Sequence, residues 1–185
     1  RIDEAERALA QLDPAPLPPA SRTVHELVVA GIAIRRLRTK PARAALGRAR
    51  RAAHHARIPA LTAEVERAHL DLSTPAATRI ARGGGRFLLR GEVEALLASK
   101  AFVVDACRRV VRRAGQVVSL AKRPVLFALA RALGEAWPGD VPRDALVARA
   151  FGWKLADESH RARLRVEIGR LRAVLRTLAA VSATK

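Results

Sequence analysis

Apolar residues recur along most of the chain at intervals of three and four, the spacing of helices that bury one face. The clearest case is residues 159–178, where one narrow apolar stripe consists of Leu164, Ile168, Leu171 and Leu175. The opposite side of this predicted helix carries small residues and arginines, namely Ser159, Ala162, Arg163, Val166, Gly169, Arg170 and Ala173. A face of this kind lets a large partner approach closely.

Arginine dominates the polar positions of the same segment. Arg161, Arg163, Arg165, Arg170, Arg172 and Arg176 are opposed within it by Glu167 alone. The planar guanidinium group matches phosphates and guanine edges, and a helix fits the major groove of duplex DNA. A basic surface helix that only faces water is the alternative, since most charge runs do so. The segment alone does not decide between these two interpretations.

The first half of the chain predicts helical hairpins. Helical spacing and proline positions favour helices at residues 2–12, about 21–38, 42–57 and 60–72, with a proline-rich linker at 13–19. Ser21 or Thr23 is expected to cap the second helix, with Glu26 at capping-box distance from Thr23. Small residues then favour close packing of the third and fourth helices: Ala45, Leu46, Ala49, Ala53, Ala56, Leu61, Val65, Ala68 and Leu72. This stretch resembles tetratricopeptide repeats over roughly 50 residues, without the full repeat signature. The preferred interpretation is a plain all-helical platform for dimerisation or for a partner protein.

The second half predicts short strands and three further helices. Strands are expected at 78–81 and 87–90, joined by a turn at Gly83-Gly84-Gly85, and a helix at 92–99. A strand at 102–105 and a hairpin at 110–120 that turns at Ala114-Gly115 follow, then helices at 122–136, 142–151 and 159–178. The expected fold class is mainly α with a small β-sheet. We expect a helical region at 1–75 and a domain of sheet and helices at 76–185.

Charge points to a polyanionic partner. The 185 residues carry a net charge of +18, with a pI near 11.8. Nucleic acid is the simplest partner of such a chain and is favoured over a membrane surface. Codon bias in a GC-rich genome also enriches arginine and alanine, so part of the excess is compatible with no function. No apolar run approaches the ~20 residues of a membrane span.

Several other chemistries find no support in the sequence. Cys107 is the only cysteine, which excludes an intramolecular disulfide, fits a reducing cytoplasm, and is expected to be structural or incidental. His54 and His55 are adjacent and point to different helix faces, so we expect no metal site. The three glycines lack the lysine of a phosphate-binding loop. No nucleophile–base–acid set is discernible, so we expect neither an enzyme nor a cofactor. The missing initial methionine suggests a fragment of a longer protein.

One resemblance covers residues 102–178. The segments FVVD, RVVRRAGQVVSLAKRPVLFALARAL, GDVPRDALVARAFG and LRVEIGRLRAVL are similar, in order and spacing, to the winged-helix DNA-binding domain of OmpR/PhoB-type response regulators. The last segment resembles the recognition helix of that family, which enters the major groove. The resemblance implies base contacts from Val166 and Arg170, with Arg163 on the same face. It implies phosphate contacts from Arg165 and Arg172 on the flanks.

Two departures from the family qualify this resemblance. Residues 1–75 lack the acidic pairs and phospho-acceptor aspartate of a receiver domain, so phosphorelay control is not expected. The family also ends in a β-hairpin wing, and the printed sequence stops at Val181-Ser-Ala-Thr-Lys185, where that wing would begin. We therefore expect a winged helix-turn-helix that lacks its wing, in a cytoplasmic regulator of transcription that reads double-stranded DNA. The alternative is a protein-interaction module with a degenerate winged helix.

Overall fold

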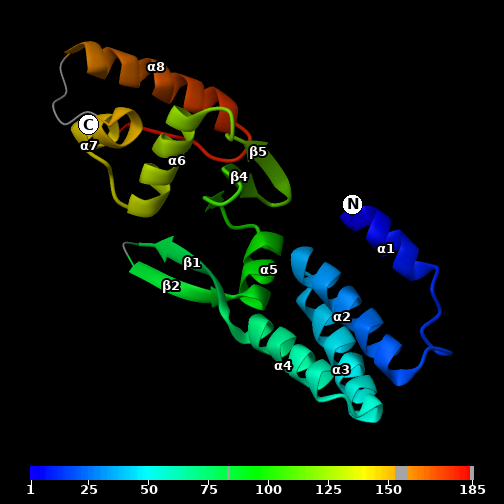
Figure 1. Ribbon diagram of the computed structural model, residues 1–185. Coiled ribbons are helices and arrows are strands. Elements are labelled where there is room, and N and C mark those ends of the chain that lie inside the picture. The colour runs from blue at the N-terminus through cyan, green and yellow to red at the C-terminus, as the bar shows by residue number, and fades with distance from the viewer. Residues whose placement is uncertain (83, 153–157, 184–185) are drawn as a thin grey trace. The chain divides into compact units, whose positions relative to one another are not determined.

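The computed structural model describes residues 1–82, 84–152 and 158–183, and these are mainly helical (Figure 1). Helices cover 61% of the described residues, which contain eight helices and two small antiparallel sheets. The expected fold class is thereby confirmed. The chain divides into two compact units, a first unit of Arg1–Thr78 with Phe87–Ala95 and a second unit of Arg79–Arg86 with Leu96–Lys185. The first unit thus extends three residues beyond the boundary expected at residue 75. It also includes Phe87–Ala95, which was expected in the second domain.

The first unit is a set of helices packed through small side chains. Its helices are α1 (Ile2–Ala10), α2 (Pro19–Arg35), α3 (Thr39–Ala56) and α4 (Pro59–Ser73). Figure 1 shows α2 and α3 side by side, and they make the most extensive helix contact of the unit. Fully buried residues of α3 line that contact: Ala42, Ala45, Leu46, Ala49 and Ala53. The residues expected to pack α3 on α4 are mostly buried, but α3 makes its most extensive contact with α2 and a smaller one with α4. Alanine lets these helix axes approach closely.

The expected capping box of α2 is wrong. The helix begins at Pro19, and the Thr23 hydroxyl donates to the Pro19 carbonyl, 2.9 Å away, inside the first turn. Glu26 is buried and accepts hydrogen bonds from Arg48 of α3 at 2.7 and 2.9 Å. This bidentate pair raises the pKa of Arg48, chiefly through the hydrogen bond with Glu26. Glu26 joins two helices instead of closing the start of one.

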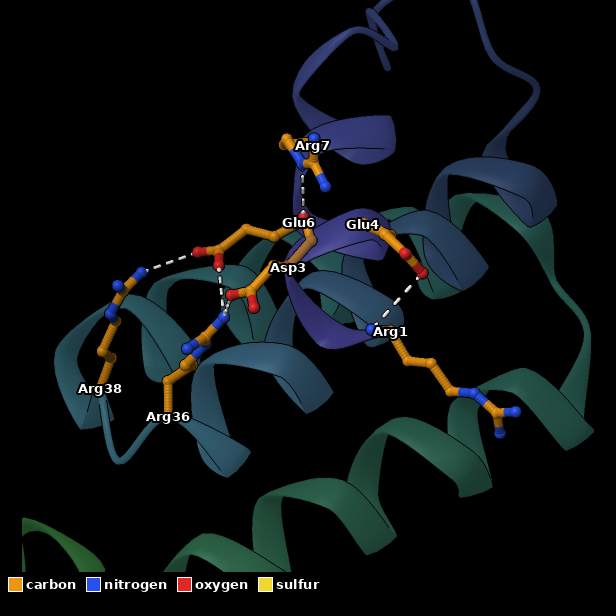
Figure 2. A network of polar contacts seen from close by, with 7 residues as sticks. All are labelled: Arg1, Asp3, Glu4, Glu6, Arg7, Arg36 and Arg38. Carbon is orange, nitrogen blue, oxygen red and sulfur yellow. Dashed lines mark hydrogen bonds and ion pairs between the residues drawn. The ribbon is translucent and has the colours of Figure 1, made fainter.

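Acidic residues attach α1 to the loop that follows α2 (Figure 2). Arg36 pairs with Asp3 and, at 3.5 Å, with Glu6, and Arg38 donates to Glu6 at 2.8 Å. No residue of α1 is buried. Figure 2 shows both arginines reaching α1 from the same loop. The attachment is therefore largely electrostatic, of a kind that salt screens.

The segment around α5 (Arg90–Ala98) begins in the first unit. The Glu94 carboxylate accepts the backbone N–H of Thr39 at 2.8 Å, and so satisfies a free donor at the start of α3. Arg90 also donates to the Asp71 carbonyl of α4. These contacts explain why Phe87–Ala95 belongs with α3 and α4.

The glycine-rich turn lies earlier than expected. The first sheet pairs β1 (Pro75–Ala81) with β2 (Gly84–Leu89), so Gly84 and Gly85 lie in a strand. The turn begins at Arg82, whose φ of 51° is left-handed. Gly83 lies outside the described residues. Gly84 and Gly85 therefore extend β2 instead of forming the turn.

The second unit contains a three-stranded sheet followed by three helices. The sheet has the order β3 (Val103–Asp105), β4 (Val110–Arg113) and β5 (Gln116–Ser119), antiparallel throughout. The helices are α6 (Pro124–Ala136), α7 (Arg143–Phe151) and α8 (Glu158–Leu175). The β4–β5 turn at Ala114-Gly115 has φ values of 48° and 84°, as expected for a two-residue hairpin turn. The predicted order of elements is therefore observed, with α8 ending three residues earlier than expected.

One core holds the sheet and the helices of the second unit together. Val104, Val111 and Val118 lie opposite one another across the three strands, and Val111 is fully buried. The helices contribute Leu126, Leu129, Leu146, Val147, Leu164, Leu171 and Leu175 to the same cluster. A Cβ on Gly134 of α6 would lie 3.3 Å from Val104, so α6 packs closely on the sheet. Among the described residues, none after α8 forms a strand.

Within the described ranges, no helix has the length and apolar character needed to cross a bilayer.

Candidate nucleic-acid interface

Helix α8 buries the stripe that its sequence predicts. Leu164, Leu171 and Leu175 are 4%, 0% and 2% exposed, and they belong to the core of the second unit. Ile168 packs against this core but stays half-buried. The seven residues predicted on the opposite side of the helix are all exposed, and Val166 among them is 54% exposed. The orientation of α8 expected from its pattern is confirmed.

The exposed side of α8 is a shallow strip between two rows of arginines. At 100° per residue, the centre of the strip is formed by Ala162, Val166, Gly169 and Ala173. Arg163 and Arg170 lie along one edge, and Arg165, Arg172 and Arg176 along the other. An added Cβ on Gly169 would meet no atom of the protein within 4 Å. We call these exposed residues the α8 face.

Two of the five candidate residues form ion pairs on their own helix. Arg165 donates to Glu158 at 2.5 Å, and both side chains are largely exposed. Arg170 donates to Glu167 at 2.7 Å, and the Glu167 side chain is only 13% exposed. The Arg165–Glu158 pair is exposed and contributes little to stability, so a phosphate group can replace its carboxylate. Glu167 therefore competes with any anion for Arg170.

The remaining arginines of α8 make contacts outside the helix. The Arg163 guanidinium lies 4.9 Å from the ring centroid of Phe151, at the end of α7. Arg161 reaches Asp144 of α7 at 3.6 Å, and Arg172 donates to the Val181 carbonyl at 2.7 Å. These contacts hold the side chains in fixed directions, which lowers the entropy lost when they bind. None is visible in the spacing of α8 alone, because each partner lies on another segment.

Charge differs sharply between the two units. The first unit has 14 basic and 10 acidic residues, a net charge of +4. The second has 21 basic and 7 acidic residues, a net charge of +14, and it contains the α8 face. Most of the excess charge of the chain thus accompanies the predicted recognition helix. An excess of positive charge of this size attracts a polyanion to the second unit.

Ion pairs also join α6 to α7, the two helices that precede α8. Glu135 near the end of α6 accepts from Arg131 at 2.6 Å and from Arg149 of α7 at 2.8 Å. The hydrogen bond from Arg131, followed by the charges of both arginines and the bond from Arg149, lowers the pKa of Glu135 although burial opposes it. The pair of bonds fixes α7 on α6. Helix α8 packs against both α6 and α7.

The other candidate residues from the sequence do not form a second site of this kind. Within the described ranges, no group of three or more His, Cys, Asp or Glu side chains is placed to hold a metal ion. Cys107 is exposed in the turn between β3 and β4. It therefore does not fill an apolar gap, the role expected for a single structural cysteine.

Comparison with known proteins gives no relative: no family model, no curated protein and no solved structure matches this chain.

Proposed function

We propose that the protein is a cytoplasmic transcription regulator that reads double-stranded DNA with the α8 face. The observation that supports this most is the row of exposed arginines on each side of that face, in the unit that carries most of the excess charge. Small residues at its centre allow close approach, and the two arginine rows are spaced to meet phosphates on both sides of a groove. On this proposal Val166 and Arg170 contact bases, Arg163 lies beside them, and Arg165 and Arg172 bind phosphates.

The three helices and the small sheet support the same proposal by their order. In a winged helix-turn-helix, the last helix is held by the two before it so that its outer face is free to enter the major groove. Here the core stripe of α8 packs on α6 and α7 and leaves the α8 face exposed. The first unit is proposed to hold a second copy of the chain or a partner protein through its helical hairpins. Light scattering of the purified chain measures whether it is a dimer.

Selection from a random duplex library tests sequence-specific reading. The immobilised protein should enrich a shared motif, and the double variant Arg163→Ala/Arg170→Ala should lose that enrichment. The matched control is Arg43→Ala/Arg51→Ala, which removes two exposed arginines of α3 in the first unit and the same total charge. The control should select the same motif as the parent protein. Equal losses in both double variants would mean that only overall charge matters, and no enrichment by the parent would reject sequence-specific binding.

A single substitution tests the role of Arg170. Arg170→Ala should weaken binding to the selected motif by about 1–3 kcal/mol and relax the preference at one base pair. An equal loss on every duplex would assign Arg170 to a phosphate. The rival proposal, a protein-interaction module, predicts little duplex affinity and partner binding that does not respond to salt.

A further inference from the structure

A second cationic surface of the second unit lies away from the α8 face. An open cleft of about 550 Å³ is lined by the tip of the β1–β2 hairpin and by the residue that ends α6. Its lining residues are Arg79, Ala81, Arg82, Gly84, Gly85, Arg86 and Trp137. No residue of α8 is among them. The volume lies within the range of small-molecule sites.

Three of the lining residues bring charge and a flat aromatic ring together. Trp137 is 59% exposed, an unusual position for so large an apolar side chain. The Arg82 guanidinium lies 5.8 Å from the centroid of its ring, within cation–π range. Arg79 and Arg82 are exposed, and in the described ranges no carboxylate pairs with either. Arg86 is already engaged in another interaction, so the argument rests on Arg79 and Arg82.

The backbone at this tip is held in an unfavourable conformation. Arg82 has a φ of 51°, which glycine or asparagine adopts with less strain. Gly84 and Gly85 follow on β2, where they place no side chain over the cleft. The left-handed turn presents the Arg82 side chain to Trp137, and the two glycines leave backbone accessible beside them.

We propose that this cleft binds a nucleotide, whose base stacks on Trp137 and whose phosphates pair with Arg79 and Arg82. An indole ring stacks on any flat base, and guanidinium groups pair with phosphate oxygens in a bidentate way. A simple anion would leave the Trp137 ring exposed, and an apolar ligand would leave two arginines without partners. The same chemistry is offered by a free nucleotide and by a nucleotide of a single strand. This inference is independent of the proposed function, since no residue of the α8 face takes part.

Binding of a labelled nucleotide tests the site directly. The probe is ADP that carries a fluorescent group on its ribose, and its anisotropy is followed as the full chain is added. Binding should saturate, and Trp137→Ala, Arg79→Ala and Arg82→Ala should each weaken it at least about tenfold. The matched control is Arg108→Ala, which removes an exposed arginine from the β3–β4 turn of the same unit. It should leave the affinity within about twofold of the parent value.

Competition then separates the sources of the ligand and the trivial explanations. Unlabelled ADP should displace the probe at least about tenfold more effectively than adenosine or pyrophosphate, because both base and phosphates are bound. A thymidine 12-mer that competes more tightly than ADP would identify a single strand as the ligand, and a weaker one would identify a free nucleotide. Displacement by pyrophosphate as effective as that by ADP would overturn the proposal, as would binding that survives Trp137→Ala.

Two further measurements keep this site distinct from the duplex site. The chain has two tryptophans, so Trp153→Phe leaves Trp137 as the sole source of indole fluorescence, which ADP should quench. The double variant Arg163→Ala/Arg170→Ala should bind ADP like the parent. Loss of ADP binding in that variant would place the nucleotide on α8 and overturn the proposal. Failure of ADP binding with intact duplex binding would reject the cleft alone.

Discussion

The two units of this protein use arginine in different ways. In the first unit three arginines pair with acids of another helix: Arg36 and Arg38 with acids of α1, and Arg48 with the buried Glu26 of α2. In the second unit acids are scarce, and the exposed arginines of α8 flank a strip of small residues. Codon bias acts on the whole chain, so it does not explain why acidic residues thin out in one unit. The difference teaches that net charge is informative only when it is assigned to a unit and a surface.

Substitution of one core leucine in each unit should have the largest effect on stability. Leu171 of α8 and Leu46 of α3 are both 0% exposed. Each substitution by alanine should cost about 2–5 kcal/mol of unfolding free energy in its own unit, through lost burial and the cavity left behind. Urea unfolding followed by circular dichroism gives the stabilities, and a gel shift gives the duplex affinity.

The two leucine variants should differ in binding. Below the urea concentrations that unfold either unit, Leu46→Ala should bind duplex DNA like the parent protein, and Leu171→Ala should bind more weakly because α8 loses its support. A destabilisation by Leu171→Ala of less than about half a kcal/mol would contradict the assigned orientation of α8.

Gly169→Ala separates a functional face from a merely solvated one. The added methyl group meets nothing in the protein, and alanine favours helix by about 0.5–1 kcal/mol over glycine, so the second unit should become more stable. The same methyl group stands on the α8 face, where it should weaken duplex binding about tenfold by preventing close approach. A more stable variant with unchanged affinity would identify the α8 face as plain solvent-exposed surface.

Glu167→Gln should sharpen the contrast in charge. The substitution frees Arg170 and removes a negative charge from the neighbourhood of the α8 face. Duplex affinity near 0.1 M salt should rise about three- to tenfold, which corresponds to about 0.7–1.4 kcal/mol. Glu66→Gln is the control, because it frees Arg50 in the first unit in the same way. An equal rise in both variants would show that the position of the charge is unimportant.

The smallest expected effect concerns pH and the packing of α6 on α7. The lowered pKa of Glu135 means that its ion pairs stabilise the folded second unit fully above the unfolded value of about 4.3. This contribution is lost as pH falls through the lower folded pKa. Because Arg131 and Arg149 are more than half exposed, it amounts to at most about 1 kcal/mol.

Unfolding by urea at pH 7 and at pH 3 measures this contribution. Glu135→Gln should reduce the stability of the second unit at pH 7 and lose less than the parent protein on acidification. Glu158→Gln is a suitable control, since its pair with Arg165 is more exposed. A Glu135 variant with the same acid loss as the parent would remove this carboxylate from the account.

The local pattern of residues predicted most helices and strands of this protein. It did not predict contacts between residues that are far apart in the sequence. The helices and strands follow from apolar spacing, prolines and turn residues, all of which are read within a few positions. Glu26 was expected to cap its own helix because its partner Arg48 lies 22 positions away, on a helix whose packing no local rule gives. The glycine turn was misplaced because three adjacent glycines leave the position of the turn open.

The candidate site shows the same division. The α8 face follows from periodicity alone, since the stripe fixes which side is buried. The contacts of Arg163 with Phe151 and of Arg161 with Asp144 depend on how α7 and α8 pack, and no local pattern predicts them. Trp137 lies directly after the helix predicted at 122–136, and the local pattern gives it no partner. Its meeting with Arg82 needs two segments that are separated by more than fifty positions.

The salt dependence of duplex binding tests whether the arginines of α8 bind DNA phosphates. The affinity of the full chain for a random duplex is measured by gel shift between about 0.05 and 0.3 M salt, and log K is plotted against log salt. With about 4–8 phosphate contacts, the slope should be about −4 to −7. Each α8 arginine replaced by alanine should reduce its magnitude by about 1 if it binds a phosphate, while Arg43→Ala/Arg51→Ala leaves it unchanged. A slope near zero would contradict the account, because the charge of the second unit would then serve no nucleic acid.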